Sequence, residues 1–98
     1  MKFLSPVLGQ GDDEALVYMC PACVCIHRIP VSPGKGAWWQ WNGDVNLPTF
    51  RPSIRVVVEG YKDAYVCHAY VTGGAVRFLS DCTHAMAGQT VPLPEMPQ

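Results

Sequence analysis

The chain has little charge, and the shortage excludes one class of protein. Only 15% of its 98 residues are charged, the net charge is −1, and the seven lysines and arginines are scattered along the sequence. Proteins whose main task is to grip a nucleic-acid backbone carry clustered cations instead. The composition therefore argues against nucleic acid as the principal partner.

Long apolar runs are also missing. No segment approaches the roughly 18 apolar residues of a transmembrane helix. The first apolar stretch is interrupted by Ser5, Pro6 and Gly9 and is followed by acidic residues, a pattern that does not fit a signal peptide. We therefore expect a protein of the cytoplasm with no membrane association.

A sustained helical periodicity is the third absence. Nine glycines and nine prolines interrupt the chain, while 49% of the residues are hydrophobic, as in folded domains. Short β-branched or aromatic segments between turn residues are typical of strands. We expect strands over residues 15–19, 24–31, 37–41, 54–59, 65–71 and 75–80, and a proline-rich tail over residues 91–98. The sequence thus predicts a single, mainly β domain over residues 1–98, built from short antiparallel strands and hairpins.

Cysteine is abundant, and its placement indicates a metal site. Five cysteines are an odd number, and a cytoplasmic chain would keep them reduced. All three histidines lie within two residues of a cysteine. In the CPAC segment of residues 20–23, two thiols face each other across a tight turn, the spacing of half a zinc knuckle. A redox role would require this motif to begin a helix, and the following residues 24–26 are poor helix formers. We therefore expect a zinc-knuckle-type site with Cys20 and Cys23 as ligands.

A second hairpin supplies candidates for the remaining ligands. A two-residue turn at residues 73–74 sets a register in which Cys67, Cys82 and His84 share one face and His68 points the other way. Cys67 is the better match to the knuckle, because adjacent strand residues cannot easily bind one ion. The fourth ligand is then His84 or Cys82. If the segment after the hairpin forms a helical turn, the register no longer decides between them.

Several side chains near these ligands have more than one interpretation. Cys25, Cys82 and His27 can each be ordinary buried residues, because free cysteine behaves as a small apolar side chain. His68 can be a core histidine, a group that supports the metal ligands, or part of an exposed site.

These motifs together resemble a family of small bacteriophage and prophage proteins, some of them labelled ammonia monooxygenase. The resemblance covers most of the chain and rests on these segments: CPAC of residues 20–23 with His27, WNGD of 41–44, PTF and PS within 48–53, Cys67-His68, and FLSDCTHA of 78–85 with AGQ of 87–89. An ammonia monooxygenase would require a membrane assembly with copper or iron, which a short thiol-rich chain does not supply.

The resemblance implies a phage-encoded protein in the cytoplasm of a bacterial host, in contact with a host or phage protein. It also favours His84 over Cys82 as the fourth ligand, because the family keeps histidine at the position of His84 and not cysteine at that of Cys82. At Val24 this chain departs from the family, which has a glycine with positive φ there. We expect either a distorted knuckle or participation of Cys25.

Three functions fit these observations, and we expect the first. Cys20, Cys23, Cys67 and His84 would fill the coordination shell of zinc, which is typical of a non-catalytic binding module. Its candidate protein-binding surface consists of Trp39, Trp41 and Arg51, since tryptophan is enriched in binding hot spots.

The first alternative is a small zinc-dependent enzyme with an open metal position, in which His68 or Asp81 would move protons. The second is single-stranded nucleic-acid binding by stacked aromatic side chains, for which the positive groove is missing.

Overall fold

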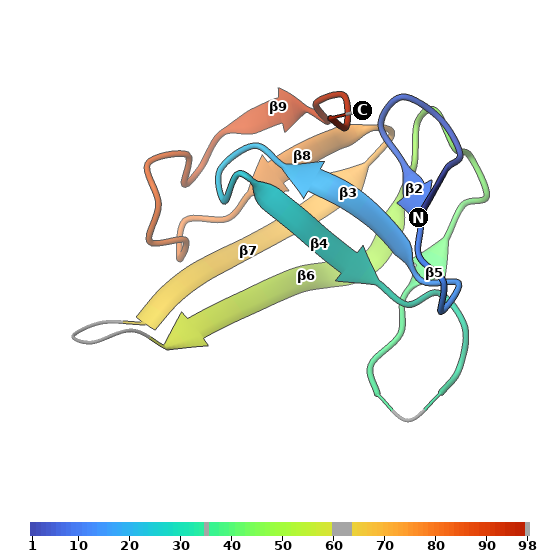
Figure 1. Ribbon diagram of the computed structural model, residues 1–98. Coiled ribbons are helices and arrows are strands. Elements are labelled where there is room, and N and C mark those ends of the chain that lie inside the picture. The colour runs from blue at the N-terminus through green and yellow to red at the C-terminus, as the bar shows by residue number, and fades with distance from the viewer. Residues whose placement is uncertain (35, 60–63, 98) are drawn as a thin grey trace.

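The computed structural model describes residues 1–34, 36–59 and 64–97, which form strands, turns and loops arranged as two antiparallel sheets (Figure 1). The first sheet has the order β1 (Lys2–Phe3), β2 (Gly9–Gln10), β3 (Leu16–Cys20) and β4 (Cys25–Ile29). The second has the order β5 (Gln40–Trp41), β6 (Phe50–Glu59), β7 (Ala64–Thr72), β8 (Ala75–Phe78) and β9 (Thr90–Pro92). The prediction of a mainly β fold with short antiparallel strands is confirmed. Within the described residues, no helix has the length and apolar character needed to cross a bilayer.

The two sheets pack face to face, with β3 and β4 lying across β6 and β7 (Figure 1). The alternation of side chains along β7 explains the packing: Cys67, Ala69 and Val71 are buried, while the residues between them are more exposed. The core between the sheets also contains Leu8, Leu16, Tyr18, Ile29, Phe50, Ile54, Val76, Phe78 and Leu93. One face of the second sheet therefore covers the core, and the other is open to solvent.

β6 begins with an irregularity that matters for the site described below. Phe50 pairs with Val71 and Ile54 with Ala69, so three residues of β6 lie opposite one residue of β7. Bulges of this kind bend a strand and redirect a side chain. The two prolines of segment 46–53 predict an extended stretch outside a central strand, whereas β6 already begins at Phe50. The bulge accommodates Pro52 within the strand, since a bulged residue does not have to donate to the ladder.

The proline-rich segment at the C-terminal end is part of the fold. β9 pairs with β8, and Leu93 and Met96 are buried. The Met96 N–H donates a hydrogen bond to the Pro6 carbonyl (2.8 Å). The stretch predicted as a tail therefore adds a strand and apolar side chains to the core.

Candidate metal centre and candidate active site

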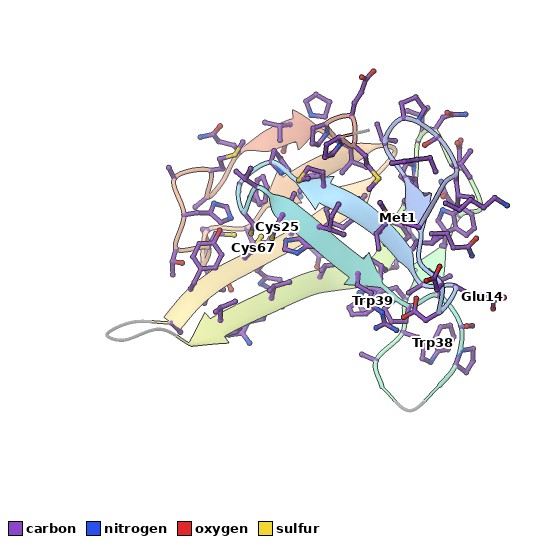
Figure 2. The ribbon with its side chains drawn as sticks, viewed as in Figure 1. Met1, Glu14, Cys25, Trp38, Trp39 and Cys67 are labelled. Atoms are coloured by element: carbon purple, nitrogen blue, oxygen red, sulfur yellow. The ribbon has the colours of Figure 1, made fainter. Side chains whose placement is uncertain are left out.

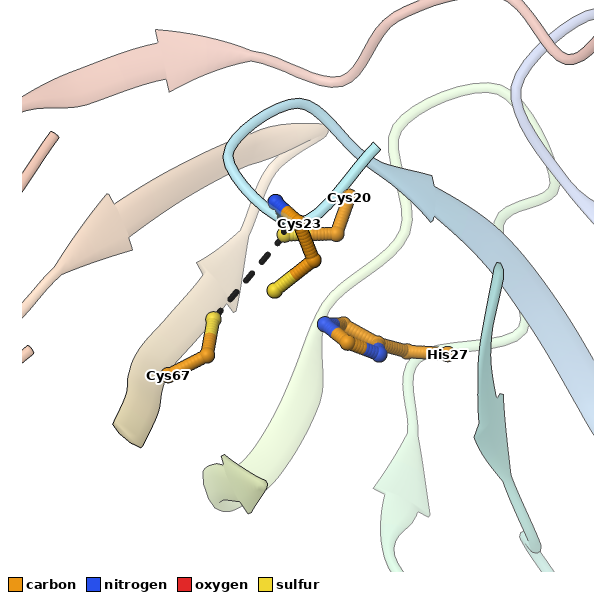
Figure 3. A group of neighbouring side chains, drawn as sticks. All are labelled: Cys20, Cys23, His27 and Cys67. Atoms are coloured by element: carbon orange, nitrogen blue, oxygen red, sulfur yellow. Dashed lines mark hydrogen bonds between the residues drawn. The ribbon is translucent and has the colours of Figure 1, made fainter. Parts of the chain in front are cut away.

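Four potential metal ligands converge between the sheets (Figure 3). Cys20 ends β3, Cys23 lies in the following turn, His27 belongs to β4, and Cys67 comes from β7 in the other sheet. Their ligand atoms all lie within 4.8 Å of one another, and three of the four residues are buried. The hairpin of β3 and β4 and the central strand β7 thus meet at this cluster.

The geometry and chemistry of the cluster fit a tetrahedral metal ion. Zinc–sulfur bonds of about 2.3 Å place two sulfur ligands ~3.8 Å apart in a tetrahedron. The Sγ atoms of Cys20 and Cys67 are 3.9 Å apart. Among the described residues, the buried Nε2 atoms of His27 and His84 find no hydrogen-bond partner, and of the two histidines His27 belongs to the cluster. A buried polar atom without a partner costs stability unless a ligand engages it. Three cysteines and one histidine can therefore hold one ion here.

The sulfur atoms of the cluster interact strongly with one another. The hydrogen bond from the Cys67 thiol lowers the pKa of Cys20, and the same hydrogen bond raises the pKa of Cys67. Burial raises the pKa of Cys23, whose sulfur also accepts a hydrogen bond from the Tyr65 hydroxyl (3.1 Å). Thiolates rather than thiols bind metals. Binding of an ion here is therefore expected to release protons.

The structure brings three of the four ligands predicted from sequence, Cys20, Cys23 and Cys67, into one cluster and adds His27 as the fourth member. It does not bring His84 or Cys82 to these three sulfurs. The chain leaves the ladder after β8 and turns back on itself. As a result the His84 ring lies against Phe78, with ring centroids 4.8 Å apart. His27 was missed because its place depends on how β4 crosses β7, which no local pattern encodes.

Exchange of each histidine for asparagine tests which one binds the metal. His27→Asn is expected to weaken zinc binding by roughly 100-fold or more, because losing a ligand costs at least as much as losing a group that supports one. His84→Asn is the matched control and is expected to change the affinity only a few-fold. Competition with a chromophoric chelator measures both values. A larger loss for His84→Asn would restore the ligand set predicted from sequence.

The knuckle turn forms although a valine directly follows its second cysteine. Val24 adopts a φ of 52°, the left-handed region that a glycine would occupy. Its N–H donates to the Cys20 carbonyl (2.9 Å), and the Cys23 N–H points at the Cys20 sulfur (3.4 Å). Cys25 is exposed and lies outside the cluster. Val24 thus takes the conformation that suits a glycine, and the strain of its backbone costs of order 1–3 kcal/mol.

A second constellation lies on the outer face of the second sheet. The Nε2 atom of His68 is 2.9 Å from the Ser53 hydroxyl oxygen, and its Nδ1 atom is 2.9 Å from one carboxylate oxygen of Asp81 and 3.2 Å from the other. A carboxylate beside Nδ1 keeps the proton on that nitrogen. Nε2 is then free to accept the Ser53 proton, the arrangement that activates a serine nucleophile.

Local structure holds each of these three side chains in place. The bulge in β6 turns Ser53 toward the outer face, and the Trp39 indole donates to the Ser53 carbonyl (3.2 Å). The buried thiol of Cys82 accepts from the His68 N–H and donates to the His68 carbonyl, both at 3.2 Å. Cys82 directly follows Asp81 in the chain. Its two hydrogen bonds to the His68 backbone therefore also hold the backbone next to Asp81 in place.

The charge state of this group follows from its contacts. The hydrogen bond from His68 holds the pKa of Asp81 below its usual value, and the positive charge of Arg55 acts in the same direction. Asp81 is therefore ionised near neutral pH. The side chains of His68 and Asp81 are 21% and 52% exposed, so a substrate can reach them.

The sequence pointed to only two members of this constellation. His68 and Asp81 were candidate proton carriers beside an open metal position, whereas the structure places them together on the face opposite the cysteines. Ser53 was not singled out. The available signal was the adjacency of Cys67 and His68, which sends His68 away from the metal and toward solvent.

The predicted aromatic surface is divided in the structure. Trp39 and Trp41 are half-buried and pack against the core. Trp38, which Figure 2 labels together with Trp39, is exposed, with 44% of its surface accessible. Arg51 is exposed and lines a hollow together with Trp38, Gln40 and Pro52. A protein-binding role for Trp39, Trp41 and Arg51 stays a prediction.

Comparison with known proteins identifies a family. The model of the family described as bacterial ubiquitination-like system serine protease (BubE) matches residues 3–79. This range includes the four residues of the metal cluster, Ser53 and His68, and it ends two residues before Asp81. No curated protein and no solved structure matches.

Proposed function

This chain belongs to the BubE family of bacterial ubiquitination-like system serine proteases, and on that premise we propose that it is a serine protease whose nucleophile is Ser53. The observation that carries the proposal is the continuous hydrogen-bonded series from Ser53 through His68 to Asp81. Nucleophile, base and orienting carboxylate are thus present in the order that acyl transfer requires.

The reaction follows from this geometry. The Ser53 oxygen attacks the carbonyl carbon of a peptide bond while Nε2 of His68 takes its proton. The imidazolium, stabilised by Asp81, returns that proton to the leaving amine as the carbon–nitrogen bond breaks. A water molecule, deprotonated by the same nitrogen, then attacks the acyl–serine ester. The imidazolium gives that proton to the Ser53 oxygen as the acyl–oxygen bond breaks, which releases the new carboxylate and restores the Ser53 hydroxyl.

We propose zinc as the ion of the cysteine–histidine cluster, with a structural role. Three thiolates and one imidazole complete its tetrahedral shell and leave no position for substrate. The cluster stabilises the fold by joining the β3–β4 hairpin to β7. Because Cys67 directly precedes His68, it also supports the strand that carries the base.

The family description supports a substrate class and a setting. We propose that the protein cleaves a flexible segment of a ubiquitin-like protein or of a conjugate containing one, in the cytoplasm of a bacterial cell. A site on the open face of a sheet suits an extended segment. Encoding by a phage and contact with a host or phage protein belong to the same proposal. A non-catalytic binding module is the competing hypothesis.

A fluorophosphonate probe distinguishes the two. The wild-type protein is expected to acquire one covalent adduct, on Ser53, located by peptide mapping with mass spectrometry. Asp81→Asn is expected to slow labelling by roughly 10³- to 10⁴-fold, because the imidazole loses the carboxylate that orients it. Asp44→Asn is the matched control, since the carboxylate of Asp44 caps a turn at Asn46 and Leu47.

Two results would contradict the protease. One is the absence of an adduct on Ser53, which would favour a binding module. The other is equal labelling of the wild type and the Asp81→Asn variant.

A further inference from the structure

Three of the four arginines of the chain surround the proposed active site. Arg51 and Arg55 lie two residues before and two residues after Ser53 in β6. Arg77, in β8, lines a hollow together with His68 and Asp81. All three arginines are exposed. Three of the seven lysines and arginines thus lie near the proposed active site.

The strand pairing places two of these side chains on the face that carries the base. Arg55 is the cross-strand partner of His68, and residues paired in this way point to the same side of a sheet. Arg77 pairs with Tyr70, which lies two residues after His68 and therefore shares its orientation. The guanidinium groups of Arg55 and Arg77 thus face the same solvent as the imidazole.

None of these three cations belongs to an ion pair within the described part of the molecule. The ion pairs among its described side chains engage Asp12, Asp13 and Asp81, and in none of them is the cation Arg51, Arg55 or Arg77. The fourth arginine, Arg28, behaves differently and lies 2.6 Å from Asp13 in the other sheet. Asp81 keeps its negative charge beside His68, and the charge of Arg55 helps to lower the pKa of its carboxyl. Among the described side chains, three positive charges therefore lie around Ser53 and the one negative charge of Asp81 opposes them.

We propose, on the basis of the protease function above, that the enzyme selects peptides with acidic side chains on either side of the bond it cleaves. Arg51 lines a hollow with Trp38, Gln40 and Pro52 on one side of Ser53. Arg77 lines another, beyond His68. An extended peptide that crosses Ser53 offers side chains to both hollows, and a carboxylate in either one meets a guanidinium with complementary geometry.

Cleavage of defined peptide libraries tests this selectivity. Pools of acetylated peptides with Glu, Gln or Lys fixed at one position at a time are digested, and the products are quantified by mass spectrometry. Glu is expected to be preferred over Gln by about two- to fivefold at each contacted position. Lys is expected to be disfavoured more strongly, and the preference is expected to shrink as salt is raised. The preference for Glu is expected to appear in KM rather than in kcat, because the arginines bind substrate without taking part in the chemistry.

Variants connect the preference to the arginines. The triple variant Arg51→Gln, Arg55→Gln and Arg77→Gln is expected to lose the preference for Glu, whereas Arg28→Gln keeps it. The corresponding triple lysine variant retains the positive charges and is expected to keep part of the preference for Glu.

Indifference to peptide charge in a protein whose Ser53 reacts with fluorophosphonate would overturn this inference and leave the protease standing. A preference that survives in the triple glutamine variant would also overturn it. If Ser53 does not react with the probe, the proposed function itself fails.

Discussion

If Ser53 is the nucleophile, replacing it by alanine is expected to abolish peptide cleavage, lowering kcat by roughly 10⁴-fold or more, as loss of the nucleophile does in serine proteases. The fold is expected to persist. The described contact of the Ser53 hydroxyl is its hydrogen bond to His68, and a partly exposed hydrogen bond contributes about 1 kcal/mol. Turnover of a cleaved peptide and thermal denaturation followed by circular dichroism measure the two effects.

Ser80→Ala is the matched control for this experiment. Ser80 is exposed and lines the same hollow as His68 and Asp81. Its removal is expected to leave kcat within a few-fold of the wild-type value. Full turnover by Ser53→Ala, or equal loss in both variants, would refute Ser53 as nucleophile.

Loss of the metal is expected to have the largest effect on stability. Apparent binding free energies of structural zinc are about 10–16 kcal/mol, as large as the whole stability of a typical small domain. Cys67→Ser is therefore expected to abolish cooperative thermal unfolding, and a strong chelator is expected to do the same to the wild type. Native mass spectrometry is expected to show one zinc per wild-type chain and none in the variant.

Cys25→Ser is the matched control for the metal. Cys25 lies five residues after Cys20 and two before His27, yet it is exposed and outside the cluster. Its substitution is expected to preserve the zinc content and the melting temperature. A metal-free protein that melts at the wild-type temperature would disprove the structural role of the ion.

The two experiments differ in what they leave intact. Ser53→Ala is expected to keep the zinc and the fold and to lose only chemistry. Cys67→Ser is expected to lose the zinc, the fold and the chemistry, because Cys67 and His68 share one segment of β7. Activity that persists in a fully folded, metal-free protein would show that the base is held without the cluster.

The strands β3, β4, β7 and β8 were predictable because their signals are local, whereas β1, β2 and β9 were not predicted and the strand predicted over residues 37–41 is limited to Gln40–Trp41. Alternating side chains and the turn at residues 73–74 specify the β7–β8 hairpin, and Thr72 pairs with Ala75 as that turn requires. The same alternation sends Cys67 inward. Cys20 and Cys23 follow from the spacing of a tight turn alone.

The proposed active site was not predictable by the same means, because it depends on departures from regular geometry. The bulge between Phe50 and Ile54 aims Ser53 at His68, and no period-two pattern reveals it. Asp81 reaches His68 only because the chain leaves the ladder after Phe78. The approach of His27 to Cys67 likewise depends on the packing of one sheet against the other.

Cys67 and His68 are neighbours in β7 and point to opposite faces of the sheet, which limits how this sequence can vary. Neighbouring strand positions exchange faces when the register slips by one residue. A single insertion or deletion just before position 67 would therefore turn the sulfur toward solvent and the imidazole toward the core, destroying both sites at once. We therefore expect that related chains differ in length in their loops and that they keep the spacing within β7 together with Cys67 and His68.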